Sequence, residues 1–156
     1  MRHIAHRGNI DGPDPELENH PDQLLYAINR GYEIEIDVRV IDRRIWLGHD
    51  EPQYEITQEQ VIEFSRHAFW HCKNVYALNY FVQFGRRASF FWHNTDDYTI
   101  TSSGEIWVYP GKPPAGYSIA VMPELWCKNN IELGSYIGIC SDYIERYRHQ
   151  CSKWLT

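Results

Sequence analysis

The pattern of hydrophobic and polar residues along the chain alternates between strand-like and helix-like periods. The clearest strand is the segment IEIDV at 34–38, where apolar and acidic residues alternate strictly and so face opposite sides of a sheet. A turn near Asp42 and a second apolar run at 45–47 predict a hairpin over 33–49. Similar short runs predict further strands at 4–5, 75–78, 89–92, 98–101, 105–109, 118–122 and 138–140.

Helical periods lie between several of these strands. Pro21 and Gly31 are suited to the first turn and the end of a helix over 21–30. Thr57 and Gln60 form a capping box that opens a second helix, whose apolar side extends to Phe69. Shorter helices are predicted at 81–86, 129–133 and 142–148, the last with Asp142 as its cap. Strands that alternate with helices predict an α/β fold with a mostly parallel sheet.

Composition limits the domain number and the functional classes that fit this chain. The 156 residues fit one domain over 1–156, and a hydrophobic content of 43% with six Trp and eleven Tyr indicates a packed globule. A net charge of −6 disfavours a general nucleic-acid binder, which would present a basic face. No signal-peptide pattern or membrane-length apolar run is present, so we expect a cytoplasmic protein that does not insert into a membrane.

The four cysteines form no CxxC pair and have no zinc-type spacing. We therefore expect structural, reduced thiols rather than metal or redox chemistry at Cys72, Cys127, Cys140 and Cys151.

Candidate chemistry begins with the acidic face of the 34–38 strand. Glu35 and Asp37 lie on the same side, about 7 Å apart, and repel each other unless a cation lies between them. A divalent metal ion such as Mg²⁺ or Ca²⁺ would remove this repulsion, because both prefer carboxylate oxygens. A hairpin strand with one solvated face would show the same alternation, so the pattern leaves both interpretations open.

Histidines before and after the acidic strand favour the metal interpretation. His6 ends the first strand at a turn that Gly8 permits, and His49 follows the hairpin. Cleavage of a phosphodiester needs one group that accepts a proton and one that donates a proton, and two imidazoles can fill these roles. The guanidinium of Arg7 can bind the phosphate oxygens. Five other histidines are interpreted as structural by default: His3, His67, His71, His93 and His149.

The order and spacing of these residues carry a family resemblance. His6-Arg7-Gly8, Glu18-Asn19, Glu35-x-Asp37 and His49-Asp50 resemble the N-terminal signature of the glycerophosphodiester phosphodiesterase family, within the phospholipase-C-like phosphodiesterases. The similarity is good over residues 2–50, and "GICSDY" resembles the last strand of the family.

The resemblance implies a fold and a set of roles. It implies a reduced TIM-type (β/α) barrel with seven or eight strands and shortened or missing helices, because 156 residues are too few for a full barrel. It implies hydrolysis of a small-molecule glycerophosphodiester with Mg²⁺ or Ca²⁺, often through a cyclic phosphate, and leaves the oligomeric state open. By motif match, the acid/base pair would be His6 and His49, the metal ligands Glu35 and Asp37, the phosphate contact Arg7, and a ligand or supporting residue Glu18.

One departure from the family pattern concerns its third strand, which usually carries Glu-x-Lys. The segment "ALNYF" places Asn79 and Phe81 at those positions, and an amide without charge should bind a metal less tightly. Glu124 is a candidate for the missing carboxylate and Lys112 for the missing cation, although a structural role for Glu124 is an equal alternative. The departure favours a second hypothesis, a phosphodiester- or sugar-phosphate-binding module without catalysis.

Overall fold

The computed structural model describes residues 1–84, 88–127 and 130–151. Arg86 and Asn129, at the limits of two predicted helices, and the side chains of His149 and Cys151 lie outside the described residues. Ten strands form one sheet: β1 (Arg2–His6), β2 (Glu33–Ile41), β3 (Arg44–Leu47), β4 (Tyr54–Ile56), β5 (Ala68–Cys72), β6 (Ser89–Phe91), β7 (Tyr98–Ile100), β8 (Ile106–Val108), β9 (Ser118–Val121) and β10 (Gly138–Ser141). The helices are α1 (Pro21–Asn29), α2 (Gln58–Phe64), α3 (Val75–Phe84), α4 (Ile144–Cys151) and the 3-10 helices η1 (Pro123–Leu125) and η2 (Asn130–Ser135).

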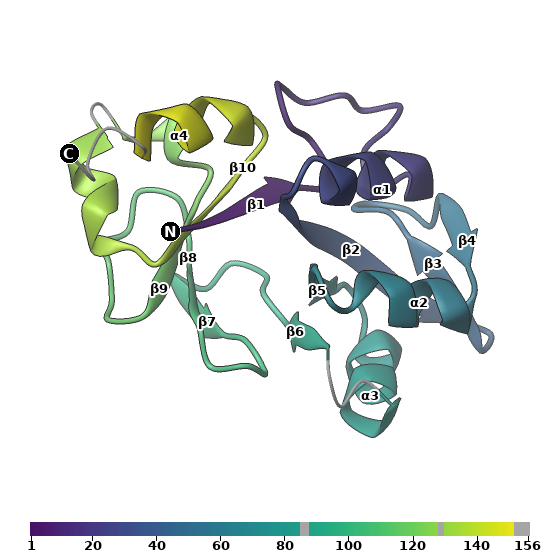
Figure 1. Ribbon diagram of the computed structural model, residues 1–156. Coiled ribbons are helices and arrows are strands. Elements are labelled where there is room, and N and C mark those ends of the chain that lie inside the picture. Colours follow the sequence, from purple (N-terminus) through teal and green to yellow (C-terminus); the bar gives the residue numbers. More distant parts are fainter. Residues whose placement is uncertain (85–87, 128–129, 152–156) are drawn as a thin grey trace.

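The sheet is curled, with parallel strands in the order β6-β5-β2-β1-β10-β9-β8 (Figure 1). β3 and β4 extend β2 as an antiparallel hairpin, and β7 pairs antiparallel with β8. Beyond β7, Ser102 N–H donates to Phe90 O at 2.8 Å, which brings this segment beside β6 without a strand ladder. The predicted α/β class is therefore confirmed as a curled, half-barrel sheet with few helices.

Apolar side chains pack on both faces of this sheet. The convex face, with side chains such as Ile34, Ile36 and Trp70, packs with α1, α2 and α3 side chains such as Leu24 and Phe64. The concave face carries a separate cluster of buried residues from six strands: Ile4, Phe69, Phe91, Trp107, Ile119, Val121 and Cys140. Strict alternation in each strand separates the two sets, as the 34–38 pattern predicted for β2.

Aromatic rings fill the concave side between strands that are distant in the sheet. The Phe69 ring on β5 lies 5.5 Å from the Trp107 ring on β8, and the Phe91 ring on β6 lies 4.7 Å from it. Each such pair adds about 0.5–1.5 kcal/mol to the burial of its rings. These contacts hold the two arms of the curled sheet together.

One predicted strand is wrong. Residues 75–78 begin helix α3, because the Asn74 side chain accepts a hydrogen bond from Ala77 N–H at 2.9 Å and so acts as the helix cap. The strand beside β2 is instead β5, whose Phe69 the prediction had included in the preceding helix. That helix, α2, ends at Phe64, although its predicted capping box at Thr57 and Gln60 is present.

Several other local predictions are confirmed. The hairpin pairs Val38 with Leu47, and α1 begins at Pro21. Gly8 has a φ of +84°, the left-handed conformation that its turn requires. Among the described residues, every helix is too short or too polar to cross a lipid bilayer.

Candidate functional site

The parallel register brings polar side chains from neighbouring strands to one end of the concave face. His6 pairs with Glu35, and Asp37 pairs with His71 on β5. On the other side of β1, Ala5 pairs with Ser141, so that Asp142 follows β10 beside His6. Because in-register neighbours in a parallel sheet point the same way, these side chains meet at the carboxyl ends of the strands. In barrels and open sheets of parallel strands, active sites and ligand-binding sites usually lie at this end.

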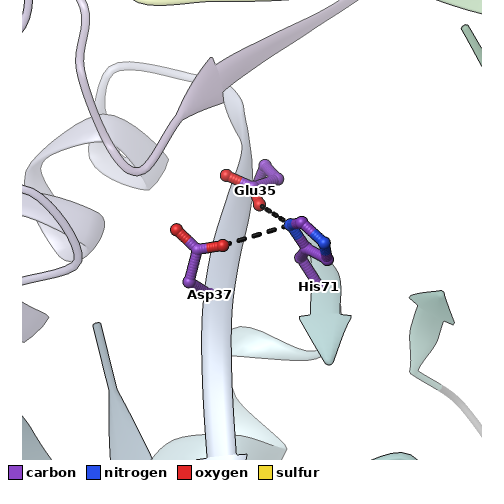
Figure 2. A group of neighbouring side chains, drawn as sticks. All are labelled: Glu35, Asp37 and His71. Atoms are coloured by element: carbon purple, nitrogen blue, oxygen red, sulfur yellow. Dashed lines mark ion pairs between the residues drawn. The ribbon is translucent and has the colours of Figure 1, made fainter. Parts of the chain in front are cut away.

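Three of these side chains converge on one point (Figure 2). His71 Nδ1 lies 3.4 Å from Glu35 Oε1 and 3.1 Å from Asp37 Oδ1. One donor atom from each residue lies within 4.8 Å of the others. Glu35 and Asp37 are 2% and 1% exposed, so both carboxylates are held away from water. The two acidic side chains are therefore on a buried face rather than on a solvated one.

The His71 ring is held in one orientation. Its Nε2 lies 2.8 Å from the carbonyl oxygen of His93, which can only accept, so Nε2 carries a proton. The ring also stacks on Phe91 with centroids 4.8 Å apart. Burial would lower the pKa of His71, but the two carboxylates outweigh it and raise the pKa to about 9. Without a metal ion, Nδ1 is therefore protonated at neutral pH and the imidazolium lies between the carboxylates.

Asp37 is the most enclosed carboxylate of the site. Its backbone N–H donates to Asn19 Oδ1 at 2.9 Å, and Oδ2 lies 3.0 Å from Arg7 Nε. Its Oδ1 has no hydrogen-bond partner of good geometry and faces His71, with Lys73 Nζ at 3.7 Å. Burial would raise the pKa of Asp37, but His71, Arg7 and Lys73 hold it well below its usual range. Asp37 is therefore ionised, with one buried oxygen directed into the cluster.

His6 is paired with an acid that is distant in the sequence. Its Nδ1 lies 2.8 Å from Asp142 Oδ1, so the carboxylate orients the ring. Its Nε2 points the other way and lies 3.9 Å from Glu35 Oε2. Burial opposes protonation of His6, but Asp142 and Glu35 outweigh it and raise the pKa of His6. The arrangement resembles the pairing of histidine and aspartate in proton-transfer sites.

The loop after β1 supports these ligands. Arg7, at a φ of +52°, donates from its backbone N–H to Glu35 Oε2 at 3.2 Å. Its Nη1 donates to Glu18 Oε2 at 2.8 Å, and Asn9 Nδ2 donates to both Glu18 and Asp142. Arg7 and Glu18 thus lie at the predicted site, where they position the carboxylates.

Asp142 is a further position where the prediction is wrong. It was expected to cap the last helix, but α4 begins at Ile144 and the Asp142 carboxylate contacts His6 and Asn9. Glu124 lies close by. Its carboxylate accepts from Ser141 Oγ at 2.8 Å and from Asp142 N–H at 3.1 Å. These bonds favour the structural alternative for Glu124, as a clamp on the end of β10.

His49 reaches this end of the sheet through its backbone. Gly48 N–H donates to Asp37 O at 3.1 Å, and the guanidinium of Arg39 donates to the carbonyl oxygens of residues 48–50. A Cβ on Gly48 would lie 2.2 Å from Glu51 O, so this loop requires glycine. The His49 ring pairs with Asp50 at 2.8 Å and makes no hydrogen bond or ion pair with His6, Glu35 or Asp37 among the described residues.

Two predicted residues lie apart from the cluster. Asn79 is on helix α3, where its Oδ1 accepts from Gln83 Nε2 at 3.1 Å, so its placement on the third strand beside Asp37 was wrong. Lys112 follows β8 and pairs with Asp97 at 2.9 Å, with 40% of its side chain exposed. Phe81 is buried in the convex core rather than directed into the site.

His71 and Lys73 lie beside Asp37, where Asn79 and Phe81 were expected. His71 is on β5, the parallel neighbour of β2, and Lys73 directly follows this strand. The prediction missed both residues because it placed the third strand seven residues too late. The aromatic and apolar run "AFWHC" before Lys73 was the available signal for this strand.

Comparisons with models of protein families, with curated proteins and with solved structures found no match for this chain. A buried carboxylate oxygen that has no hydrogen bond of good geometry, beside a second carboxylate and an oriented imidazole, fits a divalent cation, since all three groups are metal ligands.

Proposed function

We propose that the polar cluster at the carboxyl ends of the strands hydrolyses a phosphodiester with the help of a divalent cation. The observation that carries the proposal is the orientation of His6. Asp142 holds its Nδ1 at 2.8 Å, which leaves Nε2 directed toward the Glu35–Asp37–His71 cluster. A proton-transfer group beside a cation site is the combination that phosphodiester cleavage needs.

The proposed cation would be held by Glu35, Asp37 and His71, and would neutralise charge on the phosphate oxygens. His6 would transfer the proton of the attacking or leaving oxygen, a role worth about 10²–10⁴-fold in rate. Lys73, which lies 3.7 Å from Asp37 Oδ1, offers a charge for the phosphate in place of the predicted Lys112. The curled parallel sheet supports the accompanying proposal of a reduced TIM-type barrel.

The proposed substrate is a glycerophosphodiester, on the strength of the sequence resemblance. His49 would be the second acid/base group, because its loop is bound to the backbone of β2 next to Asp37. In the structure its ring pairs with Asp50, so this role requires the ring to turn toward the phosphate.

A binding module without catalysis is the second candidate. Two observations favour it: the His71 imidazolium can neutralise the carboxylates by itself, and the His49 ring does not contact the cluster. Such a module would gain thermal stability from a phosphodiester and never turn it over.

Hydrolysis assays separate the two candidates. The purified protein, His6→Ala, His49→Ala and Asp142→Asn are incubated with a glycerophosphodiester and with a bis(aryl) phosphate, with Mg²⁺, Ca²⁺ or Mn²⁺. We expect His6→Ala to lower kcat/KM at least about 100-fold. His67→Ala is the matched control, because this exposed histidine precedes the same strand as His71 and bonds through its backbone.

Full activity in His6→Ala would refute the acid/base assignment. Ligand-induced stabilisation with no turnover under any of the three metals would favour the binding module instead.

A further inference from the structure

The third donor of the cluster is a nitrogen, and this sets the class of cation. We propose that the site selects a later first-row dication, such as Co²⁺, Ni²⁺ or Zn²⁺, over Mg²⁺ and Ca²⁺. The inference rests on the metal-binding part of the proposed function and differs from the predicted choice of Mg²⁺ or Ca²⁺. It follows from the position of His71 on β5, the strand that pairs with Asp37.

The donor set is the first argument. Glu35 Oε1, Asp37 Oδ1 and His71 Nδ1 are two carboxylate oxygens and one imidazole nitrogen. Mg²⁺ and Ca²⁺ take oxygen ligands, whereas imidazole suits the later first-row dications such as Ni²⁺ and Zn²⁺. With His71 in place of a third carboxylate, the site has one negative charge fewer to attract a hard cation. The imidazole nitrogen is instead a ligand that a softer cation prefers.

The orientation of the His71 ring is the second argument. Nε2–H donates to His93 O at 2.8 Å, and Phe91 stacks on the ring face. A metal-bound histidine usually donates its other ring N–H to a carbonyl or carboxylate in this way, which fixes the tautomer and leaves the ligating nitrogen free. Nδ1 is thereby directed at the two carboxylates before any ion binds.

The spacing of Asp37 Oδ1 and His71 Nδ1 is the third argument. Asp37 Oδ1 is buried, has no hydrogen bond of good geometry, and lies 3.1 Å from His71 Nδ1. When two ligand atoms each lie about 2.1 Å from one ion and the angle between the two bonds is a right angle, they are about 3.0 Å apart. The observed distance is close to this value, so the two side chains would move little when an ion binds. The proton on Nδ1 leaves when the metal takes its place.

Local charge supports the same choice. Arg7 lies 3.0 Å from Asp37 Oδ2, and Lys73 lies 3.7 Å from Asp37 Oδ1. These cations offset part of the charge of the carboxylates, although Glu18 also pairs with Arg7. A hard cation, bound mainly by charge, is weakened most, while an imidazole–metal bond depends less on charge.

The experiment measures binding rather than turnover. Protein treated with a chelator and dialysed is titrated with Co²⁺, Ni²⁺, Mg²⁺ and Ca²⁺ by calorimetry at one pH. We expect Co²⁺ and Ni²⁺ to bind at least about tenfold more tightly than Mg²⁺ and Ca²⁺. His71→Glu, which restores a third carboxylate, should reduce this preference at least about tenfold, whereas His67→Glu on the exposed surface should leave it unchanged.

Spectroscopy of the unsubstituted protein covers the case in which His71→Glu does not fold. Zn²⁺ should shift the ¹⁵N resonance of His71 Nδ1 and leave Nε2 protonated, and Co²⁺ should give a ligand-field spectrum that includes a nitrogen ligand. Equal affinity for Mg²⁺ and Ni²⁺, with the His71 resonances unmoved, would overturn the inference while the proposed hydrolysis stands. No binding of any of the four ions would overturn the metal site itself.

Discussion

Two charged clusters lie on the concave face at opposite ends of the same strands, and they differ in how completely their hydrogen bonds are formed. At the amino end, Arg2 Nε donates to Glu33 Oε2 at 2.7 Å, and Nη1 lies 2.5 Å from Glu105 Oε1. Hydroxyl groups of Thr101 and Ser103 donate to Glu105 Oε2 at 2.5 and 2.6 Å. This end completes its own hydrogen bonds.

The carboxyl end contains the same kinds of charged residue, but one of its carboxylate oxygens lacks a hydrogen bond of good geometry. β1 contributes Arg2 to one cluster and His6 to the other, and β2 contributes Glu33 to one and Glu35 with Asp37 to the other. At this end Asp37 Oδ1 has no hydrogen-bond partner of good geometry. Both ends therefore contain buried, paired charges, and the carboxyl end differs in one buried oxygen, Asp37 Oδ1, that lies between cations without a hydrogen bond of good geometry. Such an exception calls for an explanation, which the amino end does not require.

The largest expected effect comes from the aromatic layer between the two clusters. Phe69 is 1% exposed, contacts Trp107, and lies under the Arg2 guanidinium at 4.5 Å. Phe69→Ala should lower the free energy of unfolding by about 3–5 kcal/mol, because it leaves a cavity. Urea unfolding measures this loss. Phe84→Ala, at a position 65% exposed, should cost less than about 1 kcal/mol, and equal losses would contradict the role of this layer.

Added metal should stabilise only through the carboxyl-end cluster. At 100 times the Kd, Mn²⁺ should raise the free energy of unfolding by about 2.7 kcal/mol, because it binds only the folded chain. Thermal denaturation should show this as a rise of about 5–10 °C in Tm. Asp37→Asn should abolish the rise, whereas Arg2→Met should retain it. A rise in Asp37→Asn as large as in the unsubstituted protein would place the metal elsewhere.

Loss of the cation at the amino end should reduce stability without an effect on metal binding. Arg2→Met leaves Glu33 and Glu105 without their cation, and should cost about 2 kcal/mol, less than a fully buried pair because Arg2 is partly exposed. Urea unfolding provides the measurement. Arg44→Met, which removes an exposed pair with Glu55 at 3.5 Å, should cost less than about 1 kcal/mol.

The smallest effect concerns pH and Glu105. Burial would raise the pKa of Glu105, but hydrogen bonds from Ser103, Thr101 and Arg2 outweigh it and hold the pKa below its ordinary value of 4.5. The stabilisation is therefore present above pH 4.5 and is lost as the pH falls through the lower pKa of the folded state. The difference in unfolding free energy between the protein and Glu105→Gln should shrink on acidification. A difference that stays constant from pH 7 to pH 3 would contradict it.

Much of the candidate site could be predicted from residues that are close in the sequence. His6, Arg7, Glu18, Glu35 and Asp37 lie at the site where short motifs placed them. His71 and Asp142 could not be found in this way. His71 depends on which later strand pairs with β2, and Asp142 is separated from His6 by 136 positions.

The sequence by itself determined the elements that depend on neighbouring residues: the 33–49 hairpin, the capping box at Thr57, the turn at Gly8, and the shared face of Glu35 and Asp37. Tertiary structure decided which strand lies beside β2, and so put His71 where Asn79 was expected. It also decided at which of the two charged clusters every carboxylate oxygen has a hydrogen bond of good geometry. The physical reason is that periodicity and capping are properties of a few adjacent residues, whereas strand pairing and charge compensation join residues that are distant in the chain.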